Sequence, residues 1–151
     1  MSKWFKNPMK SRIAFYLPSN VQGKEMPAAK RKKLIGATMA FLVKRLGGGT
    51  QIEVLGSFEG AGGKVVQENV TICYAFASRE MMEEQEQEIN QNANTLCIKF
   101  QQESIAVEKD NWFYLFAPNK TYVENYRKFT TTAKEHGTEF GYEKWLKVSV
   151  S

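Results

Sequence analysis

The most constraining feature of this sequence is the glycine-rich stretch from Leu46 to Ser78, LGGGTQIEVLGSFEGAGGKVVQENVTICYAFAS. It opens with a triple glycine, and glycine ends helices because it adopts the left-handed conformation of a helix C-terminus. Apolar and polar residues then alternate over 50–58 and again over 65–77, and the sequence EGAGGK at 59–64 between them is typical of a hairpin turn. The stretch therefore predicts a helix that ends at residue 46, followed by two antiparallel strands.

An amphipathic helix is predicted on each side of this hairpin. Over 27–46, apolar residues recur at i, i+4, i+7 and i+11 from Ile35, and Pro27 suits the first helical position. Over 79–101, Ser78 is a suitable N-cap and several glutamates follow it, where the helix dipole favours acidic side chains.

Shorter apolar runs predict further strands at 12–17, 105–108 and 112–116. The order strand, helix, strand, strand, helix, strand predicts an α+β protein with the ferredoxin-like βαββαβ sandwich, an antiparallel sheet with both helices on one face. The run 112–116 adds an extra hairpin strand. A helix over about 120–135 and an edge strand over 146–150 would form a C-terminal extension.

The length of 151 residues predicts a single domain. Within it we expect a basic arm at 1–11, the ferredoxin-like core at 12–116 and the C-terminal extension at 117–151. The absence of a long apolar run predicts no membrane segment, and the first residues lack the apolar region of a secretory signal. We therefore expect a cytoplasmic protein.

The residues that could support metal or catalytic chemistry are few. Cys73 and Cys97 lie in apolar patterns and are interpreted as buried thiols of a reducing compartment. With His136 as the only histidine, placed at an expected helix end beside glycine, neither a metal site nor a histidine-based catalytic group is indicated. No catalytic residue and no cofactor is predicted.

Charge is distributed unevenly along the chain. Residues 1–50 hold eleven Lys or Arg against one Glu, whereas residues 51–110 hold four against eleven Asp or Glu, within an overall charge of +5. Such polarity indicates one basic and one acidic face, and hence an anionic partner.

The basic cluster Lys30, Arg31, Lys32 and Lys33 stands in the first turns of the first helix, where the helix dipole disfavours cations. Local stability does not explain it, so these residues, helped by Lys24, are the predicted nucleic-acid or anion-binding site. A solvated face that meets the acidic second helix of another copy is the alternative interpretation.

Two further features are left open by the sequence. The loop Gly47, Gly48, Gly49 and Thr50 has more glycine than a helix cap requires, which indicates close backbone approach to a neighbouring element or to a ligand. Aromatic residues of the strands could form a stacking platform for bases or could pack in the core.

The glycines also carry a resemblance. Gly48–Gly49–Thr50 after the helix, Gly60 and Gly62–Gly63 in the hairpin, and Glu68 at the start of the following strand resemble small, uncharacterised ferredoxin-like α/β sandwich proteins of bacteria and phages. This resemblance implies no activity, so no catalytic residue carries over. The fold it implies hosts many unrelated functions.

Together these observations favour a small, non-enzymatic binding protein that engages a nucleic acid, a nucleotide or a nucleoprotein through its basic N-terminal third. One alternative is a phage or mobile-element inhibitor or adaptor that binds a host defence protein. Another is a histidine-independent nuclease or nucleotide-cleaving enzyme. A protein partner and homo-oligomerisation remain open, and no membrane partner is expected.

Overall fold

The structure is a computed structural model, and it describes residues 8–21, 23–102, 104–118 and 124. Its described part is an α+β arrangement built on a five-stranded sheet with the order β4-β5-β1-β6-β7 and antiparallel pairing throughout. The strands are β1 (Ser11–Pro18), β4 (Thr50–Glu59), β5 (Val65–Ala77), β6 (Ile105–Lys109) and β7 (Trp112–Phe116). The predicted antiparallel sheet is thereby confirmed, and the arrangement is consistent with a sandwich of the ferredoxin-like type.

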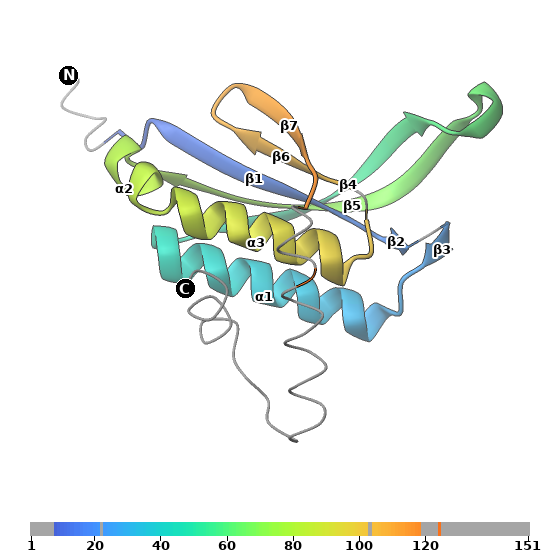
Figure 1. The fold of residues 1–151 in the computed structure, drawn as a ribbon, viewed down its shortest axis with the longest axis horizontal. Coiled ribbons are helices and arrows are strands. Elements are labelled where there is room, and N and C mark those ends of the chain that lie inside the picture. The colour runs from blue at the N-terminus through green and yellow to red at the C-terminus, as the bar shows by residue number, and fades with distance from the viewer. Residues whose placement is uncertain (1–7, 22, 103, 119–123, 125–151) are drawn as a thin grey trace.

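Two long helices, α1 (Ala28–Leu46) and α3 (Glu86–Lys99), lie side by side on one face of the sheet (Figure 1). A short helix, α2 (Arg79–Glu84), precedes α3, and the 3-10 turn η1 (Ala61–Gly63) closes the β4–β5 hairpin. The tip of this hairpin projects beyond the helices (Figure 1). The opposite face of the sheet carries no helix within the described residues.

The hydrophobic core lies between the sheet and the two long helices. Phe15 of β1, Leu42 of α1 and Phe100 after α3 are all fully buried. On β5, Cys73, Ala75 and Ala77 face this core because alternate residues of a strand share one face. The sheet therefore presents one buried face to the helices and a second, mostly exposed face to its other side.

The element boundaries differ from the prediction at three places. Pro27 is the N-cap of α1 and not its first helical residue. The segment 79–101 forms two helices separated at Gln85, within a run where Glu80, Glu84 and Glu88 stand at the four-residue spacing that makes like charges repel. Between β1 and α1, where the sequence analysis predicts neither helix nor strand, lies a small two-stranded sheet of β2 (Asn20–Val21) and β3 (Lys24–Glu25).

The predicted C-terminal helix over about 120–135, the edge strand over 146–150 and His136 lie outside the described residues. In the part that the structure describes, no helix combines the length and the apolar character that a membrane span requires.

Candidate functional site

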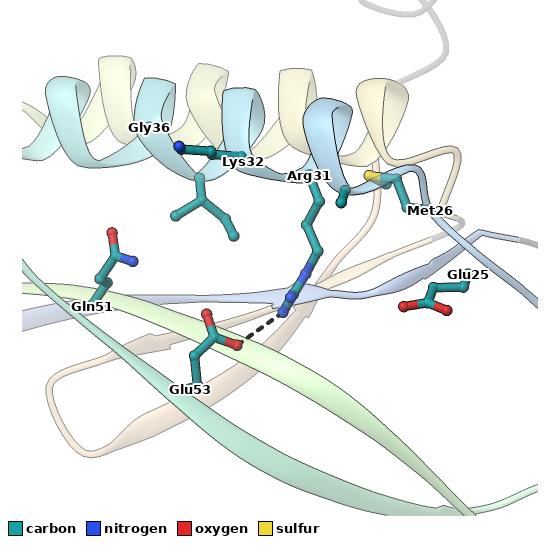
Figure 2. A pocket seen from close by; sticks show the side chains of 9 residues that line it. Glu25, Met26, Arg31, Lys32, Gly36, Gln51 and Glu53 are labelled. Atoms are coloured by element: carbon teal, nitrogen blue, oxygen red, sulfur yellow. Dashed lines mark hydrogen bonds and ion pairs between the residues drawn. The ribbon is translucent and has the colours of Figure 1, made fainter.

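A pocket of about 430 Å³ lies between the first turns of α1 and the adjacent strand β4. Its volume falls in the range of small-molecule sites in proteins. Figure 2 shows the side chains that surround it, with α1 above and the strands of the sheet below. The lining residues are Glu25, Met26, Ala28, Arg31, Lys32, Ile35, Gly36, Gln51 and Glu53.

Arg31 crosses this pocket from α1 to the sheet. Its Nη2 atom donates hydrogen bonds to Glu53 Oε2 over 3.1 Å and to Thr71 Oγ1 over 2.8 Å. Thr71 in turn donates its hydroxyl hydrogen to Glu53 Oε1 over 2.6 Å. The register of β4 and β5 places Glu53 directly opposite Thr71, so both side chains face the helix that supplies Arg31.

The two charged partners differ in their exposure to solvent. The side chain of Arg31 is 21% exposed and that of Glu53 is 56% exposed. The hydrogen bond from Thr71 has the largest effect and lowers the pKa of Glu53. Burial opposes it, and the hydrogen bond and the charge of Arg31 lower the pKa further. Glu53 is therefore a negative group that faces solvent at the pocket, while Arg31 is anchored within it.

The residues of the predicted basic site lie in different places in the structure. Arg31 and Lys32 line the pocket, whereas Lys30 and Lys33 are exposed on other parts of α1 and Lys24 is exposed in β3. Sequence reasoning missed Glu53 and Thr71 as partners of Arg31, since strand register was not available from the chain. The sequence did contain a signal that sets Arg31 apart. Arg31 stands four residues before the core residue Ile35 and so shares its helix face.

The three glycines after α1 differ in backbone conformation and in the space around them. Gly47 takes the left-handed conformation, with φ 84°, and its N–H group donates to Val43 O over 2.9 Å. A Cβ atom at Gly49 would lie 3.2 Å from Leu42 Cβ, whereas one at Gly48 would meet no atom within 4 Å. The close approach that the sequence indicated occurs at Gly49, against α1. Thr50 is exposed at the start of β4.

A second polar cluster lies on the helix-free face of the sheet. The Arg12 guanidinium sits 4.6 Å from the ring centroid of Tyr74, and Arg12 Nε lies 3.6 Å from Glu108 Oε2. The Tyr16 hydroxyl donates to Glu108 Oε1 over 2.9 Å, and burial together with this bond raises the pKa of Tyr16. These aromatic residues therefore surround a side chain of their own protein.

Glu68 lies on the same helix-free face, toward the hairpin tip. It is half-buried, it stands opposite Gly56, and its neighbours two positions along the strand are Val66 and Val70. Among the described residues nothing forms a hydrogen bond or ion pair with it. It is an unpaired carboxylate with aliphatic neighbours on its own strand.

An apolar cavity of about 400 Å³ separates β7 from the start of α3. Ile13, Ile89, Val107 and Phe116 form much of its wall, and Tyr114 also lines it. Lys109 Nζ and Glu86 Oε1, which are 3.5 Å apart, form an ion pair at this cavity.

Two kinds of chemistry find no support in the described residues. No cluster of three or more His, Cys, Asp or Glu side chains has metal-binding geometry there. Burial raises the pKa of Cys73 to about 12 and that of Cys97 to about 11. Both thiols are thus protonated at neutral pH, and a thiol nucleophile requires the opposite shift.

Solved structures with this fold exist. The chain is similar to a phage SAM (S-adenosylmethionine) lyase in complex with S-methyl-5'-thioadenosine, with a TM-score of 0.52, 18% identity and coverage of 71% of this chain and 88% of that one. The apo state of a phage SAM lyase gives a TM-score of 0.53, 18% identity and coverage of 72% and 90%. The sequence matches no protein-family model and no curated protein. At this identity the likeness establishes a shared fold.

This finding corrects the predicted function. The interpretation as a small non-enzymatic protein that binds nucleic acid is wrong, because the structural neighbours are an enzyme. The physical error lay in treating Lys30–Lys33 as one surface, whereas Arg31 is bound by Glu53 and Thr71. The same comparison shows neither of the alternatives, an inhibitor or adaptor that binds a host defence protein and a histidine-independent nuclease or nucleotide-cleaving enzyme.

The predicted partners are corrected in the same way. The ligand in the comparison structure is S-methyl-5'-thioadenosine, a small nucleoside thioether, and not a nucleic acid.

Proposed function

We propose that the protein is a lyase that cleaves S-adenosylmethionine, or a closely related adenosyl sulfonium, and releases S-methyl-5'-thioadenosine. The observation that carries this proposal is the fold, which is shared with a phage SAM lyase over 88% to 90% of that protein's chain. The pocket beside α1 supports it, because its volume of about 430 Å³ suits a nucleoside-sized ligand.

The chemistry of this substrate suits the charges of the pocket. A sulfonium carries a positive charge on sulfur, and the ionised Glu53 is a negative group open to the pocket. When the carbon–sulfur bond breaks, its electron pair stays on sulfur and gives a neutral thioether. In one route solvent water takes a proton from the carbon beside the departing one as a carbon–carbon double bond forms. In the other route the carboxylate of the amino-acid group attacks the carbon bonded to sulfur and closes a lactone.

The lowered pKa of Glu53 favours a role in binding the substrate over a role in proton transfer. A carboxylate whose pKa is lowered is a weak base, so Glu53 suits attraction and orientation of the cation better than proton abstraction. Such attraction favours the charged ground state, and therefore it acts mainly on binding. The apolar walls formed by Met26, Ala28 and Ile35 favour the loss of charge at sulfur, because a low-polarity environment disfavours the cation.

The fold assignment can be refined on the same basis. The spatial order β4-β5-β1-β6, with α1 between β1 and β4 and with α3 between β5 and β6, supports a ferredoxin-like βαββαβ core. In this assignment β7 is the extra hairpin strand at one edge.

The direct experiment is incubation of the purified chain with S-adenosylmethionine, followed by chromatographic detection of S-methyl-5'-thioadenosine. We expect one equivalent of thioether for each equivalent of substrate lost. E53Q should raise KM by about tenfold, the loss of roughly 1.4 kcal/mol of binding. E84Q, a change of an exposed glutamate on α2, is the matched control and should behave as wild type.

A third variant locates the site. Activity that is lost in E68Q and retained in E53Q would place the reaction on the helix-free face, beside the unpaired carboxylate. A wild-type chain that leaves S-adenosylmethionine unchanged would overturn the proposed function.

A further inference from the structure

We infer that Arg31 binds a carboxylate of the ligand, so that this pocket selects adenosyl compounds with an intact amino-acid group over those without one. The inference rests on the proposed function, because it names the part of the substrate that the pocket recognises.

The first observation is the unused hydrogen-bonding capacity of Arg31. A guanidinium group has five N–H donors in a planar fork. Hydrogen bonds to Glu53 and Thr71 both involve Nη2, and Nε is buried without a partner in the described part of the chain. An arginine that lines a pocket with donors to spare fits a carboxylate, which it can bind through two parallel hydrogen bonds.

The second observation is the asymmetry of the Arg31–Glu53 pair. Arg31 is largely buried and is also held by Thr71, which is fully buried, whereas more than half of the Glu53 side chain is exposed. Glu53 can therefore release its Oε2 atom from Arg31 while its Oε1 atom keeps the bond to Thr71, and Arg31 stays in position. A ligand carboxylate would replace Glu53 Oε2 on the guanidinium, and Glu53 would become free to face the sulfonium of the same ligand.

The third observation concerns the start of α1, which lines the pocket at Ala28. Pro27 caps the helix without a side-chain hydrogen bond, and the first turn has no acidic residue. The first turn of α1 thus supplies no negative side chain of its own to the positive end of the helix dipole. The helix dipole therefore adds to the attraction of Arg31 for a carboxylate. Arg31 is the one member of the basic cluster to which this inference gives a function.

The pocket is lined by both positive and negative side chains, and these complement a ligand that carries both positive and negative charges. Arg31 and Lys32 are positive, and Glu25 and Glu53 are negative. An amino-acid group next to a sulfonium offers one negative and two positive charges. S-methyl-5'-thioadenosine offers none, so Arg31 should contribute to the binding of substrate and not to that of the product.

Calorimetric titrations of the full chain with two neutral-sulfur probes test this. S-adenosylhomocysteine has the carboxylate, and S-methyl-5'-thioadenosine lacks it. We expect R31Q to weaken S-adenosylhomocysteine binding by roughly 10- to 100-fold, the range for a lost charged hydrogen-bonding group, and to leave S-methyl-5'-thioadenosine binding within about twofold. R31K should be intermediate, because lysine keeps the charge and loses the fork.

K30Q is the matched control. Lys30 is exposed, stands in the same turn of α1 and does not line the pocket, so its removal changes the net charge equally and should alter neither affinity by more than about twofold. E53Q tests the same inference without altering Arg31, and its expected effect on the affinity for S-adenosylhomocysteine is opposite to that of R31Q. It removes the competitor for the guanidinium and should strengthen S-adenosylhomocysteine binding severalfold.

The outcomes separate this inference from the proposed function. Equal effects of R31Q and K30Q on S-adenosylhomocysteine, or equal losses of both probes in R31Q, overturn the carboxylate assignment while lyase activity of the wild type still stands. If R31Q does not fold, weaker S-adenosylhomocysteine binding by E53Q overturns it instead. A wild-type chain that binds neither probe and degrades no substrate overturns both.

Discussion

The hydroxyl group of Thr71 donates a hydrogen bond of 2.6 Å to Glu53 Oε1, and the two residues are direct partners in the β4–β5 ladder. Thr71 is fully buried, so this bond fixes the carboxylate from the sheet side while Arg31 contacts it from the helix side. It is also the largest of the influences that lower the pKa of Glu53. The ionisation of the candidate site is thus set by a neutral residue that does not line the pocket.

T71V tests this relationship. Valine has nearly the shape of threonine and lacks the hydroxyl, so the pKa of Glu53 should rise toward its ordinary value of 4.5. The free energy of unfolding should fall by roughly 1–3 kcal/mol, because the lost hydroxyl both donates to Glu53 and accepts from Arg31. Carboxyl NMR titration of wild type and T71V measures the shift. T50V changes an exposed residue of β4, the strand that also holds Glu53, and it should leave the pKa of Glu53 unchanged. An equal shift in both variants would contradict the assignment.

Asp110 gives the fold an acid-sensitive contact between β1 and the β6–β7 turn. Its Oδ1 atom accepts hydrogen bonds from Ser11 Oγ over 2.7 Å and from the Arg12 N–H over 2.9 Å. The Ser11 bond, followed by the Arg12 bond, lowers the pKa of Asp110 below its ordinary value of 3.8. Because the folded-state pKa is the lower one, the stabilisation is complete above the unfolded-state pKa and is lost as pH falls through the folded-state pKa.

D110N isolates this effect. Asparagine keeps an acceptor oxygen and tolerates the positive φ of 57° at this position, but it carries no charge. The difference in unfolding free energy between wild type and D110N should therefore be constant from pH 7 to 5 and shrink below about pH 4. Urea denaturation at several pH values measures it. A difference that does not depend on pH would show that the charge contributes nothing.

The core predicted from periodicity can be tested with neighbouring residues of α1. Leu42 is fully buried, whereas Val43 is 53% exposed. L42A should lower the free energy of unfolding by roughly 2–5 kcal/mol, because it removes buried methyl groups and leaves a cavity. V43A should change it by less than about 0.5 kcal/mol. Equal midpoints of denaturation for the two variants would mean that α1 does not pack on the sheet through this face.

The elements of this fold follow from local patterns in the sequence, and the site depends on pairings that are distant along the chain. Val65–Ala77 could be predicted as a strand because side chains on a strand alternate between faces. That Glu53 stands opposite Thr71 depends on the hairpin register, which the flexible turn at 59–64 did not fix. A slip of one residue would have moved Glu53 to the helix-free face.

The basic cluster shows the same limit. Four adjacent residues of a helix point in four directions, so one anion-binding surface was never the geometric expectation. Arg31 could have been separated from its neighbours by its four-residue distance from Ile35. The partners of Arg31 could not be predicted from this spacing, because they lie on two strands that follow α1 in the chain.

The last prediction concerns the three glycines after α1, which the sequence presents as equivalent and the structure does not. At Gly47 the positive φ of 84° disfavours any Cβ atom, so G47A should cost about 1 kcal/mol of stability. At Gly48 an added Cβ meets no atom within 4 Å and φ is not positive. G48A should therefore be neutral or should stabilise the fold by up to about 1 kcal/mol, since alanine restricts the unfolded chain.

At Gly49 an added Cβ would lie 3.2 Å from both Leu42 Cβ and Met39 Cε. Met39 can move because its side chain is flexible, but Leu42 is fully buried and held by the core. G49A should thus cost roughly 1–3 kcal/mol through overpacking. The expected order of unfolding free energies is G48A first, then G47A, with G49A lowest or equal to G47A, and thermal and urea denaturation of the three variants measure it. A G48A variant that is less stable than G49A would show that the loop does not approach α1 at Gly49.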